Sequence, residues 1–150
     1  DEEFLEVPAE ALIASMQDHQ KFFPVVDRES GTLLAKFVAV ANLESNDFEA
    51  VCSGFERVIR PRLADARFFW DQDKKSPLED SLRLLENIVF QQKLGSVSDK
   101  SKRIASISRI LAEEINIDGQ LVERAALLSK CDLVSQMVGE FPELQGVMGG

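Results

Sequence analysis

Residues 57 to 75 constrain the fold most, because a proline stands between two arginines in an otherwise acidic chain. The segment reads RVIRPRLADARFFWDQDKK and carries six basic and three acidic side chains, against a net charge of −9 for the 150 residues. Pro61 fixes its own φ and disfavours helical backbone at Arg60, so we expect a bend there. Two interpretations of Arg57, Arg60 and Arg62 follow. They dock a phosphate backbone or an acidic protein surface, or they form Arg–Asp pairs along an exposed helix.

Composition places the chain among ordinary globular proteins of one or two small domains, with 45% apolar and 29% charged residues. No apolar run approaches the roughly 20 residues that cross a bilayer, so we expect no membrane contact. The first residues, DEEFLEVP, are acidic where a signal peptide is basic. We therefore expect a cytoplasmic protein, and the absence of an initiating Met suggests a piece of a longer chain.

The residues that usually carry metal or covalent chemistry are scarce. Cys52 and Cys131 lie far apart, and His19 is the single histidine. Neither a disulfide framework nor a zinc or iron site is indicated, so we predict no metal site and no cofactor in this chain. The sequence shows no glycine-rich phosphate loop and no nucleophile beside a base. We predict no catalytic residue.

The first half of the chain combines a helix, a hairpin and a second helix. Apolar residues recur at helical spacing from Pro8 to Gln20. Residues 21–27 and 33–43 are rich in Phe and Val and flank the turn sequence RESGT, which predicts an antiparallel hairpin. Pro24 removes a backbone donor and favours an edge strand or a bulge. Asn46 or Asp47 is expected to cap the helix that carries the arginines.

The second half predicts helices over residues 78–94, 98–115 and 121–138, joined by short connections into a bundle. In the middle helix the predicted inward face is made of large aliphatic residues: Ile104, Ile107, Ile110, Leu111 and Ile115. We therefore predict an α+β, predominantly helical fold. A helix-plus-hairpin front would occupy residues 1–76 and a helical domain residues 77–150.

Basic side chains gather a second time at residues 93–103, KLGSVSDKSKR, with four basic residues and one acidic residue. Phosphate binding depends on neutralisation by Lys and Arg, so any RNA contact of an acidic chain is expected at its basic patches. The candidates for contact with RNA or with a neighbouring domain are Arg57, Arg60, Arg62, Lys74, Lys75, Lys100, Lys102 and Arg103.

Several blocks in the same order resemble one family, the beta subunit of bacterial glycyl-tRNA synthetase. The blocks cover nearly the whole chain: VPAEALIASMQDHQKFFPV, ANLES, ERVIRPRLADARFFWDQDKK, FQQKLGSVSDKSKRI, LLSKCDL and EFPELQGVMG. The resemblance implies an internal fragment that holds the end of an N-terminal α+β region and the start of a helical domain similar to a degenerate HD domain, truncated at its C-terminus.

The resemblance also implies a function. In that ligase the alpha subunits use ATP with magnesium to activate glycine, and the beta subunit supplies tRNA recognition. This chain would be a non-catalytic part that supports tRNA binding and subunit architecture. Its partners would be the alpha subunit, the tRNA for glycine and the remainder of the beta subunit.

An HD-like domain raises an alternative function, because active HD hydrolases hold a divalent metal with His and Asp ligands. The candidate remnant of the His–Asp doublet is Cys131-Asp132 in LLSKCDL, and the matching histidines are missing. Three hypotheses stay open: a tRNA-binding and architectural part of the ligase, a metal-dependent phosphohydrolase module, and a purely structural spacer.

Overall fold

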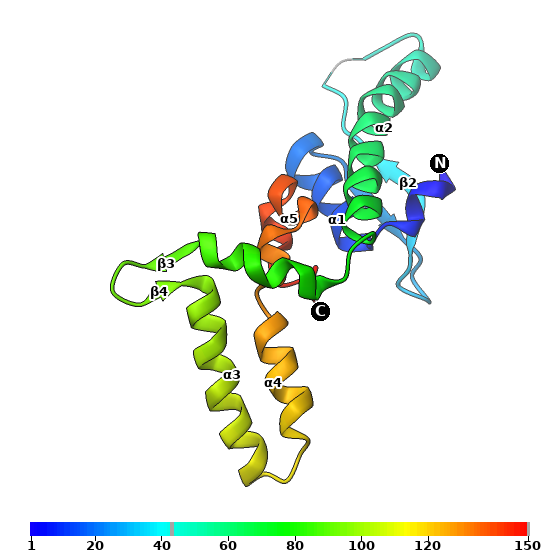
Figure 1. The fold of residues 1–150 in the computed structure, drawn as a ribbon. Helices are drawn as coiled ribbons and strands as arrows, with labels where there is room; N and C mark the ends of the chain where they lie inside the picture. The colour runs from blue at the N-terminus through cyan, green and yellow to red at the C-terminus, as the bar shows by residue number, and fades with distance from the viewer. Residues whose placement is uncertain (43, 150) are drawn as a thin grey trace. The chain divides into compact units, whose positions relative to one another are not determined.

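A computed structural model describes residues 1–42 and 44–149, except the side chain of His19. The chain divides into two compact units, Asp1–Gln72 and Asp73–Gly150. Within the described residues it is mostly helical, with two small antiparallel sheets of two strands each (Figure 1). The predominantly helical α+β class is confirmed at that level. Across residues 1–42 and 44–149, no helix has the length and apolar character needed to span a membrane.

Unit 1 contains the helix, the hairpin and the arginine-bearing helix expected from the sequence. Its elements, in order, are η1 (Glu2–Glu6), α1 (Ala9–Ala14) with its π-helical extension η2 (Ser15–His19), β1 (Phe23–Val26), β2 (Leu33–Val38) and α2 (Phe48–Asp73), whose last residue falls in unit 2. The predicted helix over residues 8–20 is confirmed.

The hairpin is also confirmed, with shorter strands than predicted. Strands β1 and β2 pair antiparallel, and their register shifts between Pro24 and Val26, as expected where proline removes a ladder donor. In the turn, Gly31 has a φ of +70°, a conformation that glycine adopts without strain. The predicted end of the second strand includes Leu43, which lies outside the described residues.

Helix α2 runs without interruption through Pro61, so the predicted break in helical backbone at Arg60 is wrong. Asp47 caps the helix, because its Oδ1 accepts the Ala50 N–H at 2.9 Å. Proline inside a helix costs about 3 kcal/mol through a lost hydrogen bond and a steric clash. Burial of Ile59 and Ala66 on the two sides of Pro61 opposes that cost, as do ion pairs made by Arg60 and Arg67.

Phe22 joins the parts of unit 1. Its ring stacks on Phe37 of β2 at 5.0 Å between centroids and meets Phe55 of α2 edge-on at 5.5 Å. These separations are typical of favourable aromatic pairs. The buried apolar residues of the unit come from all its helices and from two residues outside them, Val7 and Phe22. The full set is Phe4, Val7, Ala11, Leu12, Ala14, Met16, Phe22, Ile59 and Ala66.

Unit 2 departs further from the prediction. Its elements are η3 (Leu78–Asn87), β3 (Val89–Gln91), β4 (Gly95–Ser96), α3 (Val97–Glu114), α4 (Gly119–Leu128), η4 (Cys131–Val134), α5 (Gln136–Glu140) and η5 (Pro142–Leu144). The helix predicted over 98–115 is confirmed as α3. The expected bundle of long helices is wrong, because long α-helices are limited here to the antiparallel pair α3 and α4.

The predicted helix over residues 78–94 is replaced by a 3₁₀ helix and a small hairpin. Leu78, Leu82 and Leu85 are separated by four and three residues, a spacing typical of an α-helix, yet the segment Leu78–Asn87 is a 3₁₀ helix. Val89 and Phe90 then favour a strand, and Gly95 supplies a φ of +84° where the chain enters β4.

The predicted helix over residues 121–138 ends at Leu128. Lys130 leaves helical backbone at φ −125° and ψ 4°, and η4 follows. Ser135 then starts α5, because its side chain accepts the Val138 N–H at 3.1 Å. A serine in this place is a strong helix start signal, which competes with continuation of α4.

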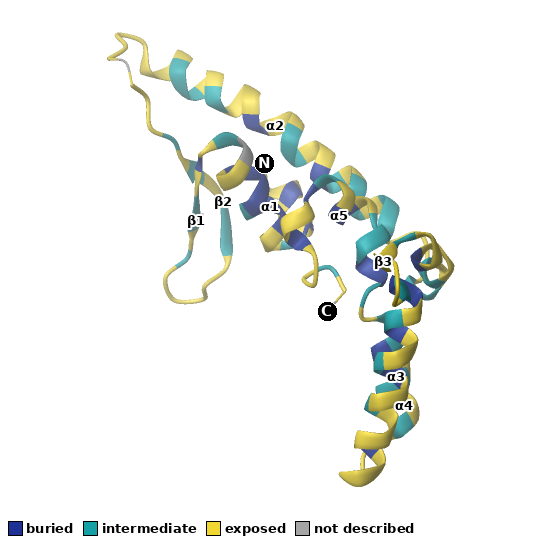
Figure 2. Ribbon diagram, turned by 90° about the vertical axis from the view of Figure 1, so that its left-hand side faces the viewer, coloured by how far each residue is buried: buried dark blue, intermediate teal, exposed yellow. Residues whose placement is uncertain are grey.

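The inward face predicted for α3 is wrong. Its buried residues are mostly small: Val97, Ser98, Ser101, Ala105 and Ala112 (Figure 2). Ile107, Ile110, Leu111 and Ile115 are instead 58% to 66% exposed. Because α3 and α4 form a close antiparallel pair, small side chains suit the surface between them better than isoleucine does.

Candidate functional site

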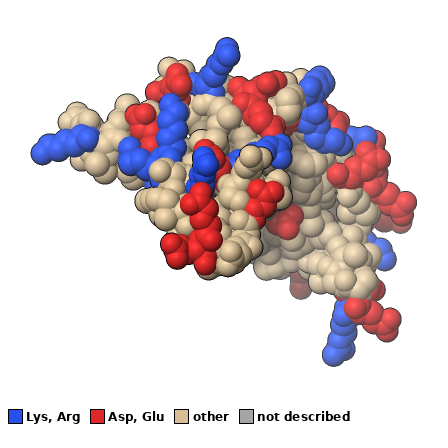
Figure 3. Space-filling model, turned by 60° about the horizontal axis from the view of Figure 1, so that its bottom comes forward, with Lys and Arg blue, Asp and Glu red and all other residues tan. Residues whose placement is uncertain are grey.

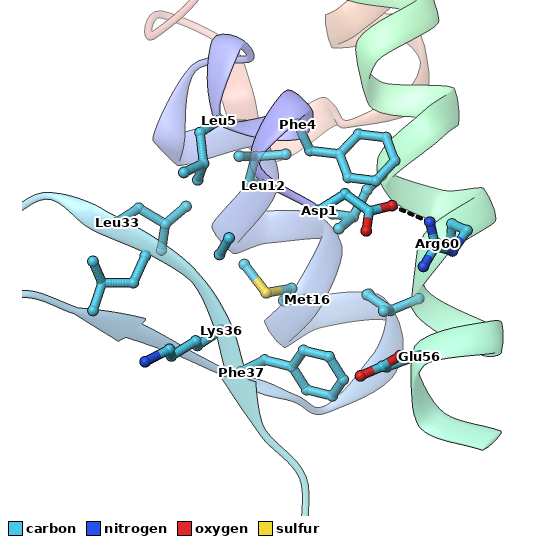
Figure 4. A pocket seen from close by; sticks show the side chains of 14 residues that line it. Asp1, Phe4, Leu5, Leu12, Met16, Leu33, Lys36, Phe37, Glu56 and Arg60 are labelled. Carbon is cyan, nitrogen blue, oxygen red and sulfur yellow. Dashed lines mark hydrogen bonds and ion pairs between the residues drawn. The ribbon is translucent and has the colours of Figure 1, made fainter. Parts of the chain in front are cut away.

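The arginines of α2 face the acidic N-terminal segment of the same unit. Arg67 makes the fullest contact: its Nη1 lies 3.0 Å from Glu3 Oε2, and its Nη2 lies 3.1 Å from Glu6 Oε2. Nη1 also donates to the Glu3 carbonyl oxygen at 3.2 Å. Arg60 forms an ion pair with Asp1 (Figure 4). These contacts fix η1 on α2, so part of the arginine segment holds unit 1 together.

The remaining arginines of the segment are placed differently. Arg57 is exposed on α2, and Arg62 Nη1 lies 3.9 Å from Asp65 Oδ2 one helical turn on. Arg67 Nε also lies 3.8 Å from Asp71 Oδ2. Arg–Asp pairs along the helix are thus present at Arg62 and Arg67, whereas Arg60 pairs with the N-terminal segment, and the role of the three predicted arginines stays a prediction. The sequence did not predict the pairing of α2 with residues 1–6, although both are strongly charged and of opposite sign.

A cavity of about 290 Å³ lies between β2, α1 and α2 (Figure 4). Most of its wall is apolar, and Asp1, Lys36, Glu56 and Arg60 supply the charged groups. The apolar lining comprises Phe4, Leu5, Leu12, Met16, Leu33, Leu34, Ala35, Phe37, Ile59 and Leu63. The volume is at the lower end for small-molecule sites. Its chemistry suits an apolar group, and among the side chains that the structure describes its lining holds no serine, cysteine or histidine.

The second basic patch lies in unit 2, around the β3–β4 turn and the first turns of α3. Ser96 and Asp99 form a capping box: Asp99 N–H donates to Ser96 Oγ at 3.1 Å, and Ser96 N–H donates to Asp99 Oδ2 at 2.9 Å. Donation by the Ser96 backbone, and then by its hydroxyl, lowers the pKa of Asp99, with a smaller effect of the Lys102 and Arg103 charges.

The cations of this patch divide into two groups. Lys100 Nζ lies 4.1 Å from the centre of the Phe90 ring, and Arg103 Nη1 donates to the Leu94 carbonyl at 3.0 Å. Both therefore hold the turn against the helix. Lys93 and Lys102 are exposed. Lys74 and Lys75, which directly follow α2, are also exposed. In the face shown in Figure 3, basic and acidic side chains are interspersed and not separated by sign.

The candidate HD remnant is buried. Cys131 is fully buried in an apolar cluster with Leu85 and Val97, and burial, followed by the charges of Asp132 and Glu79, raises the pKa of its thiol. Asp132 is 1% exposed, and its Oδ2 accepts the Gly146 N–H. In residues 1–42 and 44–149, no three His, Cys, Asp or Glu side chains gather in a way that suits a metal ion.

One polar contact of unit 2 was missed by the sequence interpretation. The Asp73 carboxylate accepts the N–H groups of Gln136 and Met137, each at 2.9 Å, and so caps α5. More than 60 residues separate these partners, and no local motif announces their pairing. A helix cap of this kind satisfies backbone donors that have no intrahelical acceptor.

Comparison with known proteins identifies the family. The family model described as glycyl-tRNA synthetase beta subunit matches residues 1–150. The chain is 58% identical over 149 residues to the glycine–tRNA ligase beta subunit of Marinobacter nauticus, covering 99% of this chain and 21% of that protein. Its identity is 55% to the beta subunit of Pseudomonas fluorescens and 56% to that of Colwellia psychrerythraea, with 99% of this chain and 22% of each relative covered. The chain thus spans about a fifth of the length of these curated relatives. With a match along its whole length, this chain belongs to the glycyl-tRNA synthetase beta subunit family.

Proposed function

We propose that this chain is a non-catalytic part of glycine–tRNA ligase that supports tRNA binding and subunit architecture. The match of all 150 residues to the beta subunit family supports this assignment. In the complete ligase, ATP and magnesium act in the alpha subunit, and the partners of this chain are that subunit, the tRNA for glycine and the rest of the beta subunit. The ligase works in the cytoplasm.

The architectural part of the proposal rests on the ion pairs of α2. Arg67 binds two carboxylates, Glu3 and Glu6, and Arg60 binds Asp1, so these guanidinium groups already have anionic partners within unit 1. Engaged cations are poorer phosphate ligands, because a phosphate must displace the carboxylates. We therefore assign Arg60 an architectural role, and Arg57, Arg62, Lys74 and Lys75 stay candidates for contact with tRNA or a neighbouring domain.

The tRNA contact is assigned to the basic patch of residues 93–103, and one observation carries it. Lys93 and Lys102 are exposed beside a turn that Lys100 and Arg103 hold in shape. The one carboxylate of the patch, Asp99, is turned to Ser96 in the capping box. Exposed ammonium groups on a fixed turn suit the phosphates of an RNA backbone, which bind mainly by charge neutralisation.

Replacement of Lys93 and Lys102 by alanine in the complete enzyme, with both subunits, tests this assignment. We expect weaker tRNA binding, and a slope of log affinity against log salt that is smaller by up to about 2, because two phosphate contacts are lost. Lys36→Ala, which removes an exposed lysine of β2, is the matched control. Unchanged affinity and slope in the double variant would remove the tRNA contact and leave an architectural role.

The HD-like character of residues 77–150 is a prediction from the resemblance. The surroundings of Cys131 and Asp132 give little support to the alternative function of a metal-dependent hydrolase. A metal ligand must lose its proton, whereas burial raises the pKa of the Cys131 thiol. Asp132 is already held by the Gly146 N–H. Phosphoester hydrolysis by the complete beta subunit with manganese or nickel, lost in Asp132→Asn, would revive this alternative.

A further inference from the structure

One stripe of α3 has a charged residue at each end, with the half-buried Ile104 and the exposed Ile107 and Leu111 between them. We name this stripe the α3 seam: Lys100, Ile104, Ile107, Leu111 and Glu114. The members follow one another by four, three, four and three residues. This is the spacing of a surface on which a second helix packs, since it keeps side chains on one line of the helix. Ile110 and Ile115 border the seam and widen its apolar part.

The seam is distinct from the surface that α3 buries against α4. Ala105 and Ala112, on the α4 side, are 3% and 1% exposed, whereas Ile107 and Leu111 are 59% and 58% exposed. At the connection between α3 and α4, Ile115, Ile117 and Leu121 are also more than half exposed. A contiguous apolar patch of this kind is unfavourable in water and marks a site of contact.

The charges on the seam indicate what its partner looks like. Its N-terminal end carries Lys100, with Arg103 beside it, and its C-terminal end carries Glu114. Both signs oppose the macrodipole of α3, because cations lie at the positive end of the helix and an anion at the negative end. A partner helix with acidic residues beside Lys100 and basic residues beside Glu114 compensates both ends. An antiparallel orientation adds a favourable arrangement of the two dipoles.

We infer that the α3 seam is covered, in the complete beta subunit, by an amphipathic helix from the part of the same polypeptide outside these 150 residues. The source is argued from length: the relatives are about five times longer than this chain, so most of each subunit is available to supply a helix. The inference rests on family membership and not on the proposed tRNA contact, and the two therefore fail independently.

Thiol labelling of the complete beta subunit tests whether the seam is covered. Ile107→Cys and Leu111→Cys are compared with Ser106→Cys, an exposed position of α3 outside the seam. Site-resolved mass spectrometry separates the new thiols from Cys52 and Cys131. We expect maleimide to modify positions 107 and 111 at least tenfold more slowly than position 106. Equal rates at the three positions would overturn the inference.

A photo-crosslinking residue at position 110 identifies the partner. Light scattering measures the mass of the isolated beta subunit and so shows whether it is a monomer or a dimer. Crosslinks to beta-subunit residues outside this chain are expected, in the isolated subunit and with the alpha subunit alike. Crosslinks to residues 1–72, to a second beta subunit or only to the alpha subunit would overturn the assigned source. If a cysteine variant fails to fold, hydroxyl-radical footprinting of Ile107 and Leu111 in the unmodified subunit gives the same decision.

Discussion

Helix α2 buries Ile59 and Ala66 and is tied to the N-terminal segment by arginines, whereas α3 buries serines and alanines and leaves its isoleucines exposed. The first helix is held by a buried isoleucine and by ion pairs. The second packs against α4, and most of the side chains that it buries are small. The difference teaches that the buried face of a helix depends on the distance to its neighbour as well as on hydrophobicity.

The largest expected effect is at the N-terminal end of α3, where larger apolar side chains are buried. Leu85 is fully buried against Val97, and Leu85→Ala should cost about 2–5 kcal/mol of local stability because it leaves a cavity. Hydrogen exchange of peptides spanning residues 78–105 in the complete beta subunit measures the loss. Leu84→Ala, at a position that is 51% exposed, is the control. Similar losses in both variants would contradict the assigned core.

Next in size is a test of the close approach between α3 and α4. Ala105 is 3% exposed, so Ala105→Leu adds three carbons to a buried position beside α4 and should cost about 1–3 kcal/mol. Faster hydrogen exchange in both α3 and α4 would report the separation of the pair. Ser106→Leu adds similar bulk on the exposed flank and should leave exchange almost unchanged. An unaffected Ala105→Leu variant would mean that small residues are not required there.

A smaller effect is expected for the ion pairs of α2. Arg67 is 31% exposed and contacts two carboxylates, so Arg67→Ala should weaken the attachment of η1 by about 1 kcal/mol after screening by solvent is considered. Backbone hydrogen exchange of residues 2–7 should be faster in the variant than in the wild type. This difference should be smaller at high salt than at low salt. Arg57→Ala is the matched control on the same helix. Equal effects of the two changes would remove the special role of Arg67.

The smallest effect is the pH dependence of the α3 cap. Hydrogen bonds from Ser96 lower the pKa of Asp99 below its ordinary value of 3.8. The cap therefore stabilises the folded state fully above pH 3.8, and this contribution is lost as the pH falls through the lower folded value. The backbone N–H groups of α3 should be better protected from hydrogen exchange in the wild type than in Asp99→Asn at pH 5. This difference in protection should become smaller as the pH falls to 2.5. A difference that does not change with pH would refute this account.

Local chemistry predicted several elements of the fold correctly. Pro24 indicated the irregular strand pairing because it lacks a donor, and Gly31 indicated the hairpin turn. The sequence over residues 98–115 predicted α3 to within a residue at either end. Spacing alone failed at Leu78–Asn87, where the leucines have α-helical spacing but the backbone is a 3₁₀ helix.

Contacts between distant residues account for most of the remaining errors. The continuity of α2 through Pro61 depends partly on carboxylates near residue 1, and the buried face of α3 depends on α4. Among the candidate site residues, the sequence identified the charges of the arginine segment and of residues 93–103. It did not show that Arg60, Lys100 and Arg103 are engaged by Asp1, Phe90 and Leu94.

The cap that Asp73 provides for α5 has a practical consequence for dividing the polypeptide. A recombinant piece that starts at residue 73 keeps the acceptor for the Gln136 and Met137 N–H groups, whereas one that starts at residue 74 loses it. Two adjacent starting points, which differ by one aspartate, should therefore differ in how firmly the first turn of α5 is held. The first residue of the second unit completes a helix that lies far from it in sequence.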